Sequence, residues 1–256
     1  MSDWIHSLPV MWMTALVFAA VFLMAALIYL LVMTLASGDR ARAFKAVNPG
    51  LMSPLGVIFG LFVAFTAVQV WNDNDRANPA LDREASALRA VVVFSSSFPG
   101  QPQERLRTLI RNYVDEVVAR EWPLMAHREL TLRTAPQHLF EALQLTLALS
   151  PNNPGQQEAQ HEIVASLESA LDARRQRIII SRAEVNPLKW LCLMIQAVTA
   201  LFVIAFVHSD NRLAAIITIA IFATGVATSV VLIAAYDRPF IGQLSITPEP
   251  LLQVEP

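Results

Sequence analysis

Apolar residues run unbroken over four stretches of the chain, and a long polar segment separates the second stretch from the third. The stretches cover about Val10–Ala36, Leu51–Trp71, Leu188–Val207 and Leu213–Tyr236. Each has the roughly 20 residues that a helix needs to cross the hydrocarbon core of a bilayer. Lys189 is their only Asp, Glu, Lys or Arg residue, and it lies near enough to an end for its stem to reach the headgroups. The pattern predicts four membrane-spanning helices.

Within the polar segment, apolar residues recur at three- and four-residue steps, as they do on one face of a helix. Such patterns occupy Glu104–Trp122, Leu139–Leu147 and Ile163–Ile178. The third could continue to Asn186, because Pro187 disfavours helical geometry in the residue before it. Two prolines and a glycine within 150–155 predict a loop. No strand-like alternation is present in the sequence, so a small helical bundle is expected.

These patterns predict an all-α, four-span transmembrane protein with a helical cytosolic domain inserted between spans two and three. Spans one and two fall in residues 1–71, the inserted domain in 72–187, spans three and four in 188–236, and a disordered tail in 237–256. At the exit from the second span, Pro79 either occupies the first turn of a new helix or kinks a continuous one.

The orientation follows from the positive charges near the span ends. More arginines and lysines flank the side shared by the two termini and the middle segment, which places these parts in the cytoplasm. The short first loop carries Arg40, Arg42 and Lys45 and favours the opposite orientation. We expect a multi-pass protein of the cell inner membrane.

Composition narrows the function classes. Hydrophobic residues make up 55% of the chain and charged residues 16%, and no basic patch with interleaved aromatic residues predicts nucleic-acid binding. The sequence lacks phosphate-loop, nucleophile-elbow and zinc-protease motifs, and its five histidines show no ligand spacing. Cys192 is the only cysteine. We therefore expect no enzyme activity, no catalytic residues, no cofactor and no metal.

The second span differs from the others because it mixes glycines with phenylalanines and ends in polar residues. One helical face carries five residues of interest: Ile58, Phe62, Phe65, Thr66 and Gln69. Such a face can simply pack against neighbouring spans, which small residues allow to approach closely. In an oligomer it could instead line a pore, with phenylalanines forming a hydrophobic constriction.

Just beyond this span lie Asp73 and Asp75. Repeated around a symmetry axis, they would form acidic rings at a pore mouth and favour cations. The alternative is that these residues only end an apolar helix in water.

Several motifs resemble the bestrophin-like family of bacterial membrane proteins over about residues 10–236. They are Gly56–Trp71, Asp75-Arg76, the run Arg83-Glu84-Ala85-Ser86-Ala87-Leu88-Arg89, Arg111-Asn112-Tyr113 and Glu121-Trp122-Pro123. The resemblance implies a four-span subunit with a cytosolic helical domain. Bestrophins are pentameric anion channels whose second span forms a neck of isoleucine and phenylalanine at four-residue steps.

The match to that neck is partial. Ile58 and Phe62 occupy two of its positions, whereas Thr66 stands where a further phenylalanine is expected. No acidic calcium clasp aligns with the chain, and Pro79 departs from the continuous helix that the family implies.

Together these observations favour a homo-oligomeric ion channel with the second span lining the pore. Its partners would be the lipid bilayer, further copies of itself, which the resemblance makes a pentamer, and inorganic ions. The alternative is a non-conducting scaffold or sensor that binds a partner through its cytosolic helices. Its contacts would come from Tyr113, Trp122, Arg174, Arg175, Arg177 and Arg182.

Overall fold

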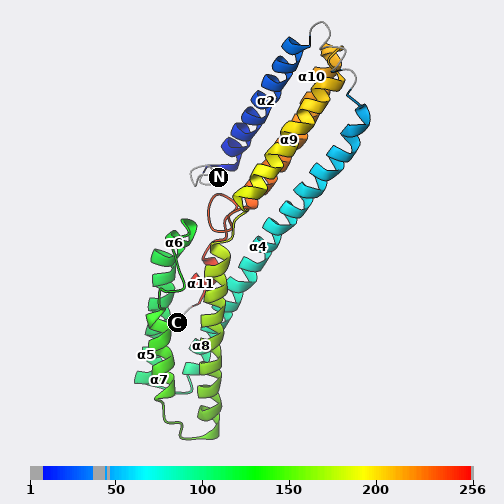
Figure 1. Cartoon of the computed structure of the whole chain (residues 1–256). Helices are drawn as coiled ribbons and strands as arrows, with labels where there is room; N and C mark the ends of the chain where they lie inside the picture. Colours follow the sequence, from blue (N-terminus) through cyan, green and yellow to red (C-terminus); the bar gives the residue numbers. More distant parts are fainter. Residues whose placement is uncertain (1–7, 37–43, 45–46, 255–256) are drawn as a thin grey trace. The chain divides into compact units, whose positions relative to one another are not determined.

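The computed structural model describes residues 8–36, 44 and 47–254, and every regular element in that part of the chain is helical. The chain divides into two compact units. Residues 1–72 and 184–238 form one, which we call the spanning unit, and residues 73–183 and 239–256 form the other, the polar unit. Figure 1 labels the helices of both.

Four helices carry a segment long and apolar enough to cross a membrane, as the sequence predicts. They are α2 (Val10–Leu35), the first part of α4 (Met52–Ser95), α9 (Pro187–Val207) and α10 (Arg212–Tyr236). A short 3₁₀ turn, η1 (Pro49–Leu51), leads into α4. In the spanning unit, α2, α9 and α10 approach one another closely (Figure 1).

The core of the spanning unit consists largely of alanine, valine, isoleucine and leucine. Ala197, Ala205 and Ala223 are among its fully buried members. Small side chains let helices approach closely, and close packing is what holds helices together where lipid tails are as apolar as the side chains. Arg40, Arg42 and Lys45, which bear on the orientation, lie outside the described residues.

Helix α4 continues without a break past Pro79, so this proline does not begin a new helix. Proline removes one helical hydrogen bond and its ring crowds the preceding turn. Residues on both sides compensate by burial, since Ala77, Ala80 and Leu81 lie in the interior. The buried stripe continues through Leu88 and Val91 at three- and four-residue steps, which anchors this half of α4 to the polar unit.

The three helical patterns of the polar segment are confirmed, with different ends. The first is α5 (Gln101–Glu116), followed by a π turn, η2 (Val117–Glu121), and by α6 (Trp122–Ala126). The second is α7 (Gln137–Leu147) and the third is α8 (Pro154–Ser181). Helix α8 therefore ends before Asn186, and it begins inside the predicted loop, where the Asn153 side chain caps it by accepting a hydrogen bond from the Gln156 backbone N–H at 2.8 Å.

The carboxyl-terminal tail, for which the sequence predicts disorder, contains a helix and several buried side chains within residues 237–254. A short helix, α11 (Glu249–Leu252), lies within it. Phe240, Ile246 and Leu251 are buried in the core of the polar unit, and the Phe240 ring meets the Trp122 ring edge-on. These apolar residues are too widely spaced to show a helical or strand period, which is why the sequence pattern did not reveal their burial.

Candidate functional site

The first part of α4 is the least buried of the four spans. In its most apolar 18-residue window 17% of residues are buried, against 28% in α2 and 33% in both α9 and α10. Its exposed side carries large apolar residues, of which Phe65 is 72% exposed and Ile58 is 54% exposed. Leu61, Val68 and Trp71 are also exposed. This span therefore offers an apolar face that the subunit leaves uncovered.

The five residues predicted to share one face of α4 differ in how deeply they are buried. Ile58 and Phe65 are exposed, whereas Phe62 is half-buried and packs against the core of the spanning unit. Thr66 is only 4% exposed and donates a hydrogen bond to the Phe62 carbonyl oxygen at 2.8 Å. Thr66 thus lies on the packed side of α4. A threonine that satisfies its own hydroxyl in this way is suited to an apolar interior.

Gln69 is half-buried, and its side-chain oxygen accepts a hydrogen bond from the Lys189 ammonium group on α9. Lys189 therefore points across to α4, where sequence reasoning expected it to reach for headgroups. Of the predicted mouth residues, Asp75 is exposed and Asp73 is half-buried, and both belong to the polar unit.

The polar unit contains a buried cluster of charges that sequence reasoning did not predict. Arg177 is fully buried and donates to both oxygens of Glu84, at 2.7 and 3.0 Å, and to Glu121 at 3.0 Å. Arg174 donates to the other oxygen of Glu121 at 2.9 Å and to the Thr134 carbonyl at 3.0 Å. Two arginines and two glutamates balance in charge. We call these four residues the buried ion cluster.

Three elements position the cluster. Glu84 comes from α4, Glu121 ends the π turn, and Arg174 and Arg177 sit one turn apart on α8. Each occupies a position within the apolar stripe of its helix, where a hydrophobic residue is expected. Charged residues of opposite sign at such positions are the sequence signal for a buried ion pair, because a buried charge must be paired.

Aromatic side chains complete the surroundings. The Tyr113 hydroxyl donates to Glu84 at 2.5 Å, and the Arg177 guanidinium lies 5.6 Å from the centre of the Trp122 ring. Burial and the neighbouring Glu84 carboxylate raise the pKa of Tyr113 well above its usual value, so it stays a neutral donor. The pKa of Arg177 is raised by Glu84 despite its burial. Arg177 therefore keeps its positive charge next to a neutral Tyr113.

This burial reduces the predicted partner-binding surface. Tyr113, Arg174 and Arg177 are buried, so they are not available to headgroups or to a partner protein. Arg175 and Arg182 are exposed. The arginines of α8 therefore serve mainly the interior of the polar unit.

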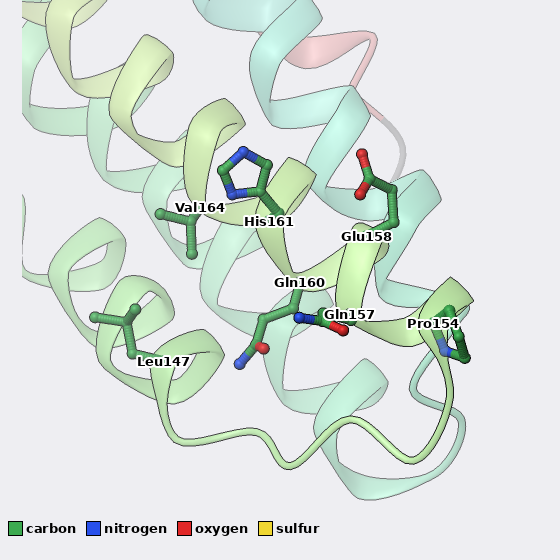
Figure 2. Close-up of a pocket in the computed structure, with 7 residues that line it drawn as sticks. All are labelled: Leu147, Pro154, Gln157, Glu158, Gln160, His161 and Val164. Carbon is green, nitrogen blue, oxygen red and sulfur yellow. The ribbon is translucent and has the colours of Figure 1, made fainter.

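A further hollow lies on the surface of the polar unit, where the end of α7 meets the start of α8 (Figure 2). Leu147 comes from α7, and the remaining lining residues, including His161 and Glu158, come from α8. Gln160 donates to the carbonyls of Thr146 at 2.7 Å and Leu149 at 3.1 Å, which fixes the connection between the two helices. Across the described residues, His, Cys, Asp and Glu form no group of three or more that could hold a metal ion.

Comparison with known proteins places the fold. The family model for the bestrophin-like domain matches residues 6–251. A point variant of a bacterial bestrophin homologue from Klebsiella pneumoniae aligns with a TM-score of 0.71 at 12% identity, over 93% of this chain and 97% of that one. Another variant of that homologue gives 0.70 at 11% identity, over 93% and 96% of the chains. A membrane protein carrying a point substitution gives 0.71 at 13% identity, over 93% and 96%. No curated protein matches the chain.

Proposed function

Because the chain belongs to the bestrophin-like family and has the bestrophin fold, we propose that it is a homo-oligomeric ion channel in which the second span lines the path. The observation that carries the proposal is the uncovered apolar face of α4, with Phe65 and Ile58 its most exposed large residues among those predicted to line the pore. Repeated around a symmetry axis, these side chains form a hydrophobic constriction that opens and closes by dewetting.

The burial of these residues supports a narrower lining than the five-residue face. Ile58 and Phe65 project from the free side of α4, Phe62 and Gln69 flank it, and Thr66 packs inside the subunit. We therefore place Ile58 and Phe65 at the constriction. Thr66 lies on the packed side of α4, where its hydroxyl donates a hydrogen bond to the Phe62 carbonyl oxygen.

The orientation is part of the proposal. We place the polar unit and both termini in the cytoplasm of a bacterial cell and the spans in its inner membrane, on the balance of positive charge around the span ends. Asp75, exposed on α4 beyond the span, then faces the cytoplasmic side and adds negative charge there.

Ion flux through proteoliposomes tests the channel. Phe65→Ala widens the proposed constriction, so it should raise flux above that of the native protein. The matched control is Leu23→Ala on α2, which truncates a side chain that is 63% exposed but lies on another span. Equal effects of the two substitutions on flux in a conducting protein would contradict the assignment of α4 as the lining of the path.

Cross-linking tests the symmetry independently of conduction. With Cys192 replaced by serine, a cysteine introduced by Phe65→Cys should form disulfides between subunits, because residues around a narrow axis approach one another. Leu23→Cys should not. A native protein that carries no flux under varied ions, voltage and pH, and that also fails to cross-link at Phe65, would favour the scaffold alternative.

A further inference from the structure

Lys189 is the one charged side chain inside the apolar spans predicted from the sequence, and it has no charged partner in the part of the chain that the structure describes. Its ammonium group donates to the side-chain oxygen of Gln69, which is a neutral acceptor. The residue is exposed, and it lies in the first turn of α9. A single amide does not neutralise a positive charge, so this charge persists at the surface of the subunit.

An uncompensated charge in a membrane span is costly unless water or a counter-ion reaches it. Lysine usually meets this demand by extending to the headgroups. Here the side chain instead reaches α4, the helix whose uncovered face we propose as the lining of the path. The hydrogen bond to Gln69 holds the ammonium group beside α4.

The pair presents donors to its surroundings. An ammonium group has three N–H donors, of which Gln69 takes one, and the Gln69 amide retains two N–H donors once its oxygen has accepted. N–H donors beside a positive charge suit a small anion. Asp73, one turn further along α4, is the nearest acidic residue in that helix and acts in the opposite sense.

We propose that Lys189 and Gln69 form an anion-attracting site beside the path, and that Lys189 sets the charge selectivity of the channel. This inference rests on the proposed function, because it assigns a role to α9 at the helix that lines the path. In an oligomer the pair repeats once in each subunit, and rings of basic side chains are a known means of favouring anions.

Reversal potentials in a salt gradient test the selectivity. Lys189→Gln should lower the anion-to-cation permeability ratio, and Lys189→Glu should lower it further, toward cation preference. Arg212→Gln is the matched control, because Arg212 is an exposed basic residue at the start of another span. An unchanged ratio in a conducting Lys189→Glu channel would overturn the proposal and leave Lys189 as a membrane anchor.

A second measurement needs no conduction. In a protein with Cys192 replaced by serine, Gln69→Cys is treated with small thiol reagents of opposite charge. With Lys189 present, the ratio of anionic to cationic modification rates should be about tenfold higher than with Lys189→Gln, as expected for one nearby charge in a partly aqueous site. Equal ratios, or a thiol that water-soluble reagents do not reach, would overturn the site. If the ratios differ but the native protein carries no flux, the channel proposal fails while the anion-attracting site stands.

Discussion

The two units of this chain bury different chemistry. The polar unit surrounds four fully paired charges with large apolar side chains such as Leu88, Ile110 and Leu167. The core of the spanning unit is made largely of small and branched apolar residues, and the buried charges among its described residues, Asp237 and Arg238, come just after the end of α10. One unit has a charged centre, and the other keeps its charges at an end.

The difference follows from the solvent that each unit is built for. In water, burial of large apolar side chains drives folding, and a paired ion cluster can fix one arrangement of helices at a cost in desolvation. Between helices in lipid that driving force is absent, so close packing of small residues replaces it. Removing a charge from one core and adding volume to the other can therefore test which kind of packing stabilises each unit.

The largest effect should follow removal of a charge from the buried ion cluster. Arg177→Met leaves Glu84 and Glu121 without their shared partner, and breaking a buried pair costs about 3–5 kcal/mol of unfolding free energy. Hydrogen exchange in detergent should accelerate in α5 and α8 and remain unchanged in α2 and α10. Arg175→Met, at an exposed position in the same helix, should alter neither. A similar loss of protection in both variants would show that the cluster is not what fixes the polar unit.

In the spanning unit, the corresponding substitution adds side-chain volume to the core. Ala223 is fully buried on α10, the helix in most extensive contact with α2. Ala223→Leu overpacks that contact and should cost about 1–3 kcal/mol. Thr224→Leu adds a comparable side chain at the next, exposed position and should cost little. Thermal unfolding in detergent measures both, and equal melting temperatures would mean that small residues are not essential between these helices.

A smaller effect is expected at Asp237, whose carboxylate accepts a hydrogen bond from the Val185 backbone N–H at 2.7 Å. Asp237→Ala leaves that buried N–H without a partner and should cost about 1–2 kcal/mol. Burial raises the pKa of Asp237 above its usual 3.8, so the native state holds this proton more tightly than the unfolded state.

The pH dependence at Asp237 follows from that direction. Stability should fall as the pH rises from about 4 through the raised pKa of Asp237, because ionisation is then more costly in the folded protein. Asp237→Asn keeps an acceptor for Val185 and removes the ionisation. The variant should therefore gain stability relative to the native protein as the pH rises, and a constant difference from pH 4 to pH 7 would contradict the raised pKa.

Sequence patterns predicted the features that depend on a single helix. The four spans and the helices of the polar segment follow from runs and periods that each helix carries alone. The continuity of α4 through Pro79 did not follow, because it depends on burial of Ala77 and Leu81 against other helices. The burial of Phe240 and Leu251 likewise depends on a surface supplied by the polar unit.

The same distinction holds for the residues of the candidate site. A phenylalanine face on the second span can be found from helical spacing, but the position of Thr66 on the packed side of that helix cannot. The contact between Lys189 and Gln69 joins residues 120 positions apart. The buried ion cluster joins residues up to 93 positions apart. Its signal was present as charges within apolar stripes, yet the pairing of Glu84 with Arg177 required the fold.

The mildest test of the buried ion cluster is Tyr113→Phe, which removes one hydroxyl and keeps the ring. Glu84 loses the hydrogen bond at 2.5 Å, while both of its oxygens still accept from Arg177, so the expected cost is about 1–2 kcal/mol of unfolding free energy.

The pH dependence of stability tests the same hydroxyl more specifically, because the pKa of Tyr113 is raised mainly by its burial. The stability that Tyr113 contributes is present below its usual pKa of 10 and is lost as the pH rises through the higher value in the folded protein. The free energy of unfolding of the native protein should therefore fall as the pH rises above 10, and it should fall less steeply in Tyr113→Phe. A Tyr113→Phe protein that loses stability at high pH as steeply as the native one would place the alkaline transition outside the buried ion cluster.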